Sequence, residues 1–192
     1  MSTQLLNERP TMTETKKKPA PKETSPYWEK FARFETDPKQ LAWVLPVRRA
    51  GISRFAELGF PTLKDEEWRF TNVAPIAKLP FRPVLDYSGD GVTVESLGQL
   101  TFAALKGPRL VFVNGHYAPE LSLVPPQPDG ITVSSLAAAL VTESALVEKH
   151  LARHARTDDN AFAALNTAFF QDGAFIHVPA GKSLAEPVRL VF

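Results

Sequence analysis

The sequence predicts an α+β protein, in which helices come first, a small mixed α/β segment follows, and strands begin near the carboxyl end. Three observations predict this order. Apolar residues recur at helical spacing over residues 26–58. An Asn-Gly pair at 114–115 separates two short extended runs. The last stretch, QDGAFIHVPAGKSLAEPVRLVF at 171–192, has the pattern of an apolar strand, a tight connection and a second apolar strand.

Composition narrows the class of protein. A hydrophobic share of 44% permits a packed core, and 22 basic against 21 acidic residues argue against a nucleic-acid footprint or a polybasic membrane surface. The absence of cysteine excludes disulfides, a thiolate nucleophile and cysteine-ligated metal within these residues. No apolar run approaches the roughly 20 residues of a membrane helix, and the N-terminus lacks the apolar segment of a signal peptide. The expected location is therefore the cytoplasm, with no membrane partner.

Residues 1–25 are predicted to form a disordered polar tail. The run TMTETKKKPAPKETS is dominated by Thr, Lys, Pro and Glu, which cannot bury enough apolar surface to offset the entropy of ordering. Lys16–Lys18 could serve as a nucleic-acid hook. Nearby glutamates weaken this patch, so a solvated tail is the favoured interpretation.

A domain of helical and mixed α/β structure is expected over residues 26–170. In its first helix, Ser25 is a candidate cap and Pro26 fits the first helical position. The apolar face carries residues spaced i, i+4 and i+7, namely Tyr27, Phe31 and Phe34.

The second helix is predicted from Pro46 near its start to Gly59 just past its end. Its buried side is expected to hold Val47, Ile52, Phe55 and Leu58. Three arginines fall largely on the other side and are interpreted as a solvated face: Arg48, Arg49 and Arg54.

The segment PTLKDEEWRFTNV is predicted to open another helix. Thr62 and Asp65 have the spacing of a capping box, and the carboxylates at 65–67 favour a first turn, where the helix dipole is positive. Metal or acid–base chemistry is the alternative, but consecutive helical residues do not face one another. Trp68 and Phe70 are the expected buried anchors.

The middle of the chain is expected to mix strands with helices. RLVFVNGHYAPELS is a predicted hairpin, and GITVSSL is a strand in which Ser134 or Ser135 caps the next helix. That helix should run from Leu136 to about Ala155, with a break near Thr142. DDNAFAALNTAFF forms a further helix, whose predicted caps are Asp158 or Asp159 and whose expected apolar side carries Phe162, Leu165 and Phe169.

Candidate chemistry is sparse. His150 and His154 are spaced to share one metal ion, with Asp158 as a conceivable third ligand, but the favoured interpretation is an ordinary polar helix face. His116 is interpreted as an exposed histidine, and His177 as a surface histidine or one satisfied by hydrogen bonds. The AGKS run at 180–183 lacks the glycine that a phosphate loop needs five residues before its Gly-Lys pair, so Gly181 is interpreted as a turn glycine. We therefore assign no catalytic or metal-ligating residue and expect no enzyme.

Three segments carry a family resemblance. GFPTLKDEEWRFTNVAPI at 59–76 resembles the N-terminal hallmark of the SufD family, a subunit of the SUF iron–sulfur cluster assembly machinery. RLVFVNGHYAPELS at 109–122 looks like that family's hairpin, and residues 165–192 resemble its entry into a β-helix core. The sister subunit SufB shares the β-helix but lacks the KDEEWRFTN signature, so SufD is favoured over SufB.

The resemblance implies that residues 171–192 begin a right-handed parallel β-helix, here truncated. It implies a non-catalytic scaffold in the SufBCD complex, with SufB-like and SufC-like ATPase partners. The complex assembles the iron–sulfur cluster, and this segment is expected to bind no cofactor. The chain is then expected to be an N-terminal fragment. The alternative is a genuine short protein whose last strands pair with another chain. Two competing functions are a stand-alone adaptor that binds a protein through exposed strand edges and the basic helix face, and a metal-dependent hydrolase that uses His150 and His154.

Overall fold

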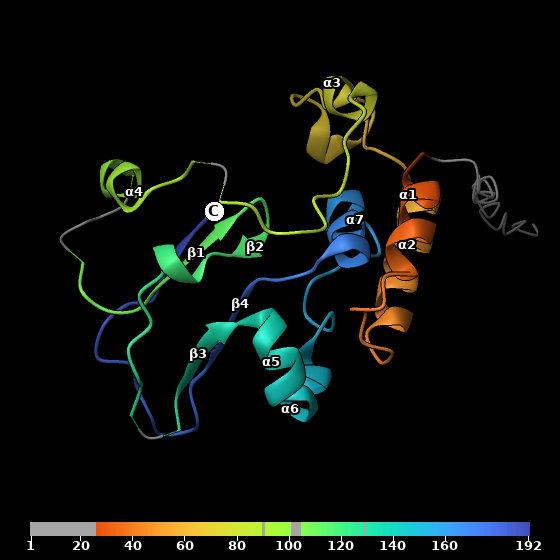
Figure 1. The fold of residues 1–192 in the computed structure, drawn as a ribbon. Helices are drawn as coiled ribbons and strands as arrows, with labels where there is room; N and C mark the ends of the chain where they lie inside the picture. Colours follow the sequence, from red (N-terminus) through yellow and green to blue (C-terminus); the bar gives the residue numbers. More distant parts are fainter. Residues whose placement is uncertain (1–25, 90, 101–104, 129) are drawn as a thin grey trace, which may run out of the picture.

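The computed structural model describes residues 26–89, 91–100, 105–128 and 130–192 (Figure 1). The predicted tail at 1–25, with its candidate cap Ser25 and the run Lys16–Lys18, lies outside the described residues. Helices come first, and two small sheets with short helices follow, which confirms the α+β class. The right-handed parallel β-helix stays a prediction.

The described helices and strands follow one another in this order. They are α1 (Pro26–Glu35), α2 (Leu45–Leu58), the 3₁₀ turn η1 (Glu66–Trp68), α3 (Ala74–Lys78), α4 (Val94–Leu100), β1 (Arg109–Val113), β2 (His116–Tyr117), the 3₁₀ turn η2 (Pro119–Leu121), β3 (Thr132–Ser135), α5 (Leu136–Thr142), α6 (Ser144–His150), α7 (Ala161–Phe169), β4 (Ala174–His177) and β5 (Arg189–Val191).

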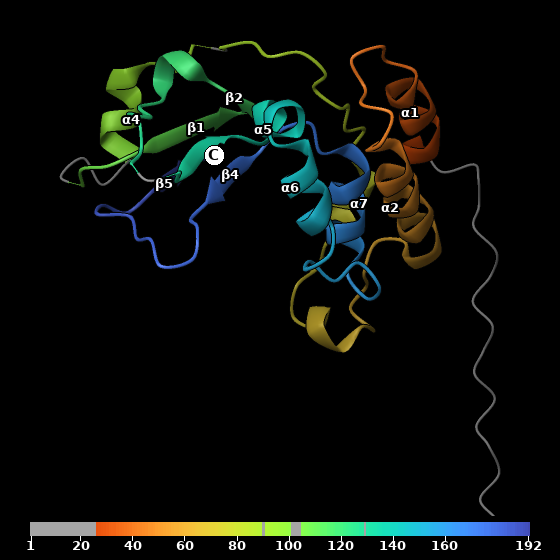
Figure 2. The ribbon, with the colours of Figure 1, turned by 90° about the horizontal axis from the view of Figure 1, so that it is seen from below.

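A helical layer of α1, α2 and α7 lies to one side of the strands (Figures 1 and 2). Its core contains Phe31 and Phe34 of α1 with Ile52 and Phe55 of α2. These are the residues that the helical spacing marks as apolar faces, so both predicted helices are confirmed. Val47 and Leu58 are only partly buried.

The approach of α2 to α7 depends on a glycine. A Cβ at Gly51 would lie 2.7 Å from the backbone nitrogen of Ala168 and 2.9 Å from the carbonyl oxygen of Ala164. Both alanines are fully buried. Small residues on both helices therefore let the two backbones come close.

The start of α7 corrects one prediction. Its cap is neither Asp158 nor Asp159 but Asn160, whose side chain accepts a hydrogen bond from the backbone nitrogen of Ala163 at 3.0 Å. Asn160 directly precedes the first helical residue, the position from which a side chain reaches the amide three residues on. The expected apolar residues of α7 are partly buried rather than central: Phe162, Leu165 and Phe169.

The segment after α2 forms one 3₁₀ turn, where the sequence predicts a helix. The Asp65 carboxylate accepts from the backbone nitrogen of Thr62 at 2.7 Å, so the carboxylate's half of the capping box is present. Trp68 packs against Phe162 with ring centroids 5.3 Å apart. The prediction that Phe70 is a buried anchor is wrong, because its side chain is 90% exposed. Trp68 itself is only partly buried. Residues two apart in a helical turn point in different directions, so the contact of Trp68 with Phe162 turns Phe70 outward.

The predicted hairpin is confirmed as β1 and β2, which pair antiparallel. Asn114 and Gly115 both have positive φ, 51° and 84°, which a two-residue turn of this twist requires. The two predicted strands of the last stretch are present as β4 and β5, and they lie in different sheets. Strand β4 pairs antiparallel with β3, and β5 pairs parallel with β1.

The helix after β3 is capped by Ser135, whose hydroxyl accepts from the backbone nitrogen of Ala138 at 3.1 Å, as predicted. The predicted break is present as Glu143, between α5 and α6. The helical run ends at His150, earlier than the expected Ala155. Across the described ranges, we find no helix of the length and apolar character that crossing a membrane demands.

Candidate interaction cleft

A cleft of about 330 Å³ opens where the helical layer meets the strands. Val44, which directly precedes α2, and Arg48 of α2 line it from one side, and Leu140 of α5 lines it from another. His116 of β2 and Asp172, between α7 and β4, complete the wall. The cleft therefore gathers residues from elements that lie far apart in the sequence.

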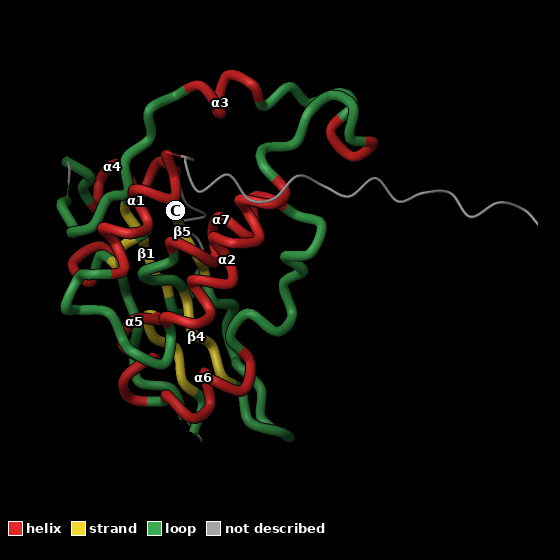
Figure 3. The backbone as a smooth tube through the Cα atoms, turned by 90° about the vertical axis from the view of Figure 1, so that its right-hand side faces the viewer, coloured by secondary structure: helices red, strands yellow, loops and turns green. Residues whose placement is uncertain are grey.

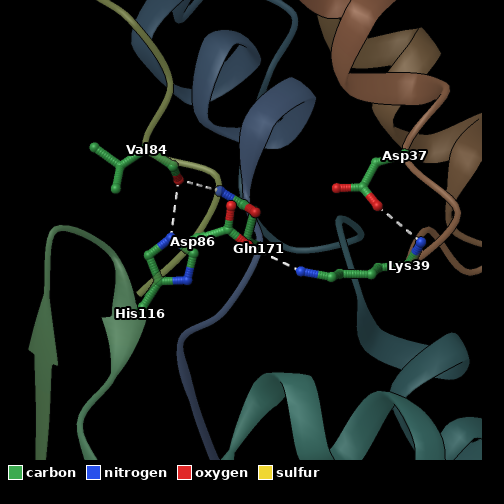
Figure 4. A network of polar contacts seen from close by, with 6 residues as sticks. All are labelled: Asp37, Lys39, Val84, Asp86, His116 and Gln171. Atoms are coloured by element: carbon green, nitrogen blue, oxygen red, sulfur yellow. Dashed lines mark hydrogen bonds and ion pairs between the residues drawn. The ribbon is translucent and has the colours of Figure 1, made fainter. Parts of the chain in front are cut away.

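One rim of the cleft is formed by an extended segment that we call the strap, residues 79–89. It belongs to the long connection between α3 and α4, which Figure 3 shows as loop. The Val84 carbonyl oxygen accepts from Gln171 Nε2 at 2.6 Å and lies 2.8 Å from His116 Nε2 (Figure 4). Because a carbonyl oxygen can only accept, His116 must carry its proton on Nε2. These two bonds join the strap to β2 and to the end of α7.

Two further contacts fasten the strap. Lys39 Nζ lies 2.9 Å from Asp86 Oδ1, and the hydroxyl of Tyr87 donates to Glu120. The Lys39 hydrogen bond and charge hold the pKa of the Asp86 carboxyl below its ordinary value, and the Tyr87 hydrogen bond does the same for the pKa of Glu120. Lys39, Asp86 and Glu120 are exposed and Tyr87 is partly buried, so these contacts contribute little to stability.

The carboxylate of Asp172 accepts hydrogen bonds from backbone N–H groups. Its Oδ1 accepts from the nitrogens of Ala137 at 2.9 Å and Gly173 at 2.8 Å, and its Oδ2 accepts from the nitrogen of Tyr117 at 3.1 Å. The side chain thus joins the start of α5 to β2. Its bond to the nitrogen of Gly173 also holds the turn of the chain between α7 and β4.

The floor of the cleft corrects a second prediction. Arg48, expected on a solvated face, is 5% exposed. Its guanidinium lies between the rings of Phe34 and Phe170, 5.0 and 4.7 Å from their centroids, and Nη2 donates to the Phe170 carbonyl oxygen at 2.8 Å. Burial lowers the pKa of Arg48 to about 10, so the group keeps its charge near neutral pH.

The other two arginines of α2 are more exposed. Arg49 pairs with Glu35 at 2.8 Å and is exposed, as predicted. Arg54 is partly exposed, pairs with Glu57 at 2.5 Å and donates to the carbonyl oxygen of Asp158. Neither residue reaches the cleft.

The histidine pair does not gain a third ligand. His150 Nδ1 and His154 Nε2 are 3.4 Å apart and exposed, but α6 ends at His150. The helix therefore does not continue to bring Asp158 onto the same face. Within the described parts of the chain, no group of three His, Asp or Glu side chains is placed to hold a metal ion.

The other residues considered for chemistry have structural roles or positions in the fold. Glu66 pairs with Arg69, which fits capping and turn formation better than chemistry at 65–67. His177 is half-buried in β4 between exposed residues. Gly181 has φ of 75°, in a turn closed by the bond from the Lys182 nitrogen to the Pro179 carbonyl oxygen. It is thus a turn glycine, as predicted.

The sequence does contain a signal that Arg48 is buried, although its charge suggests exposure. Arg48 stands four residues after Val44, four before Ile52 and seven before Phe55, all of which are buried. It therefore lies on the buried stripe of α2. Gln171 and the strap residues offer no such signal, because their partners are distant in the sequence.

The comparisons with known proteins indicate one family. Residues 22–190 match the family model described as the SufBD protein N-terminal region. The iron–sulfur cluster assembly SufBD family protein slr0076 of Synechocystis sp. is 30% identical over 76% of this chain and 31% of its own length. ABCI9 of Arabidopsis thaliana, of the same family, is 27% identical over 80% of this chain and 36% of its own length.

A shorter match is closer in identity. The SufBD family protein slr0074 of Synechocystis sp. is 45% identical over 28% of this chain and 11% of its own length. The chain spans about a third of the length of the first two relatives. The match of residues 22–190 to the family model covers most of the sequence, so the chain belongs to the SufBD family of iron–sulfur cluster assembly proteins and matches that family's N-terminal region.

Proposed function

We propose that this chain serves as part of a non-catalytic scaffold subunit of the SUF machinery, acting with SufB-like and SufC-like proteins. The observation that carries the proposal is the family match over residues 22–190, together with relatives named for iron–sulfur cluster assembly. The complex, rather than this segment, assembles the cluster and uses ATP.

The state of the polar groups in the cleft supports a binding role over a catalytic one. Asp172 accepts three backbone hydrogen bonds, and Asp86 is paired with Lys39. A general base needs a free lone pair and a pKa near neutrality. Here the pKa of Asp86 is lowered instead, and the oxygens of Asp172 are already used.

The segment that favours SufD over SufB in the sequence has a defined place in the fold. In KDEEWRFTN, Asp65 closes the turn with Thr62, and Trp68 packs on Phe162 of α7. The signature thus anchors the chain to the helical layer, while Phe70 projects outward. This arrangement leaves an aromatic side chain available to a partner.

Exposed apolar side chains on the last strands suit a protein partner. They are Ile176, Val178, Leu190 and Phe192. These same residues also favour the second candidate function, a stand-alone adaptor that pairs its strand edges with another chain. The two candidates differ in the partners that they require.

The test is capture of the protein from its own cells. A tag at the N-terminus, placed at the native locus, allows the bound proteins to be identified by mass spectrometry and the complex to be weighed. The scaffold proposal requires SufB-like and SufC-like proteins in fixed stoichiometry. Other stable partners in their place would favour the adaptor.

A matched pair of variants refines the test. Phe70→Ser alters a side chain that is 90% exposed, so the fold should survive. Reduced capture of a SUF partner by Phe70→Ser, but not by Leu63→Ser, would place that partner on the signature segment. If the tagged wild-type protein is captured without any SUF component, the scaffold proposal is contradicted.

A further inference from the structure

Two histidines come together where α6 ends. His150 is the last residue of α6, His154 follows in the turn after it, and both side chains are exposed. His150 Nδ1 lies 3.4 Å from His154 Nε2, and the planes of the two rings differ by only 22°. Two ring nitrogens, each able to bind a metal ion, are therefore neighbours at the surface.

The backbone holds this arrangement, although the helix that normally brings residues i and i+4 together has ended. The turn is closed by the bond from the Arg153 nitrogen to the His150 carbonyl oxygen at 3.2 Å. Ala152 has a φ of 56°, a left-handed conformation that is unfavourable for a residue with a β-carbon. Leu151 packs against the core cluster that contains Val147 of α6. The core therefore anchors the turn that carries His154.

The separation of the two nitrogens suits one coordination geometry. Zinc binds imidazole nitrogens at about 2.0–2.1 Å in a tetrahedron, so two of its ligand nitrogens lie about 3.3–3.4 Å apart. Ligands at right angles, in a square-planar or octahedral ion with bonds of the same length, would lie about 2.9 Å apart. The observed 3.4 Å therefore favours zinc.

The surroundings of the pair favour a metal that accepts neutral nitrogen ligands. Within the described parts of the chain, no Asp or Glu side chain joins the two histidines in a group that could hold a metal ion. Their close neighbours in the sequence include two cations, Lys149 and Arg153. Mg²⁺ and Ca²⁺ need oxygen ligands, whereas imidazole suits zinc. With two neutral ligands beside two cations, the zinc is expected to exchange with solvent.

We propose that His150 and His154 form a two-histidine zinc site, in which Nδ1 of His150 and Nε2 of His154 bind one Zn²⁺. Each neutral ring then keeps its proton on its other nitrogen, so zinc binding releases no proton from the rings. A rotation of each ring points both lone pairs at the ion, and the exposed side chains permit it. Water fills the two remaining positions. The proposal goes beyond the scaffold role and does not depend on it.

The test uses the full chain without a histidine tag. Zn²⁺ is titrated into the protein, and NMR spectra that correlate ring nitrogens with ring protons report which nitrogen binds. We expect a saturable change, with one zinc per chain, at Nδ1 of His150 and Nε2 of His154. The rings of His116 and His177 should not respond over the same range. Mg²⁺ is the control ion and should cause no change, because it prefers oxygen ligands.

Variants distinguish one shared ion from two separate histidines, with each affinity measured by calorimetry. His150→Asn and His154→Asn should each weaken zinc binding by about tenfold or more, and the double variant by no more than about twofold beyond either. His177→Asn, which removes a histidine outside the pair, should leave the affinity within about twofold. Two independent sites would instead keep their affinity and lose half of the bound zinc in each single variant.

Three results would overturn the proposal. They are no saturable change in the wild-type protein below the zinc concentration that shifts His116 or His177, coordination through only one ring of the pair, and unchanged affinity in a folded His150→Asn or His154→Asn variant. Both residues of the pair are exposed, so their variants should fold. The first two results need only wild-type protein.

Discussion

The two ionisable residues at the centre of the cleft, Arg48 and Asp172, are held in opposite ways. The carboxylate of Asp172 accepts hydrogen bonds from three backbone nitrogens, whereas Arg48 donates from Nη2 and its Nε and Nη1 nitrogens make no hydrogen bond with the described residues. Asp172 therefore stabilises the fold through hydrogen bonds. The burial of the charged Arg48 side chain costs free energy, so the stability of a variant without this charge can be predicted.

Arg48→Met should leave the free energy of unfolding within about 1 kcal/mol of the wild-type value, or raise it. Methionine has a similar length and packs against Phe34 and Phe170, and it ends the desolvation cost that lowers the pKa of Arg48. The lost hydrogen bond to Phe170 offsets part of this gain. Chemical denaturation measures the change, and a loss above about 2 kcal/mol would mean that Arg48 is needed for stability.

Tyr87→Phe should raise the pKa of Glu120 toward its ordinary value of 4.5, because the donor that lowers it is removed. A lowered carboxyl pKa stabilises the fold above the pKa of the unfolded chain, and that contribution disappears as the pH falls through the folded pKa. The variant should therefore lose stability less steeply than wild type below about pH 4.5. NMR titration of the Glu120 carboxyl carbon checks the shift.

The control for this titration is Tyr27→Phe, which removes a hydroxyl from the helical layer, where Tyr27 packs on Phe55 and Phe60. It should leave the Glu120 titration unchanged. An unmoved titration in Tyr87→Phe would show that another group sets the Glu120 pKa.

Among the elements, the packing of α2 on α7 depends on close approach rather than on large side chains. Gly51 faces Ala164 and Ala168, and the larger residues of α7 pack around this contact. Two helices with small residues at their crossing gain backbone contact but tolerate little added volume.

Gly51→Ala should destabilise the protein by about 1–3 kcal/mol, because the added methyl group meets backbone atoms that cannot rotate away. Alanine's higher helix propensity offsets only about 1 kcal/mol of this. Urea denaturation measures the difference. Gly98→Ala on α4 is the matched control, since a Cβ there has nothing within 4 Å, and it should be neutral or slightly stabilising.

For the whole molecule, Asp172→Ala should have the largest effect of these changes, a loss of about 2–4 kcal/mol. The substitution leaves the nitrogens of Tyr117, Ala137 and Gly173 without their shared acceptor. Thermal and chemical denaturation test the prediction. Asp159→Ala, which breaks one exposed pair with Arg156, should cost less than about 1 kcal/mol. Equal effects would contradict a special role for Asp172.

What the sequence can predict follows from the range of each interaction. The helices over residues 26–58 and the turn at 114–115 depend on neighbours within a few residues, and both are confirmed. The charge of Arg48 predicts exposure, but its position on the buried stripe of α2 determines its burial. The parallel pairing of β1 with β5 and the hydrogen bond from Gln171 to the strap join segments that lie far apart in the sequence. Local sequence patterns therefore do not predict them.

The placement of α7 and β5 has a consequence for how the protein is made. The helices α1 and α2 emerge from the ribosome early, but residues 59–160 must follow before α7 arrives to cover Phe34 and Ile52. Likewise, β1 waits for residues 189–191 before its parallel neighbour exists. Contacts of such long sequence separation slow folding, because the chain must close large loops first. The apolar faces of α1 and α2 thus stay uncovered, and open to chaperones, until α7 has been synthesised.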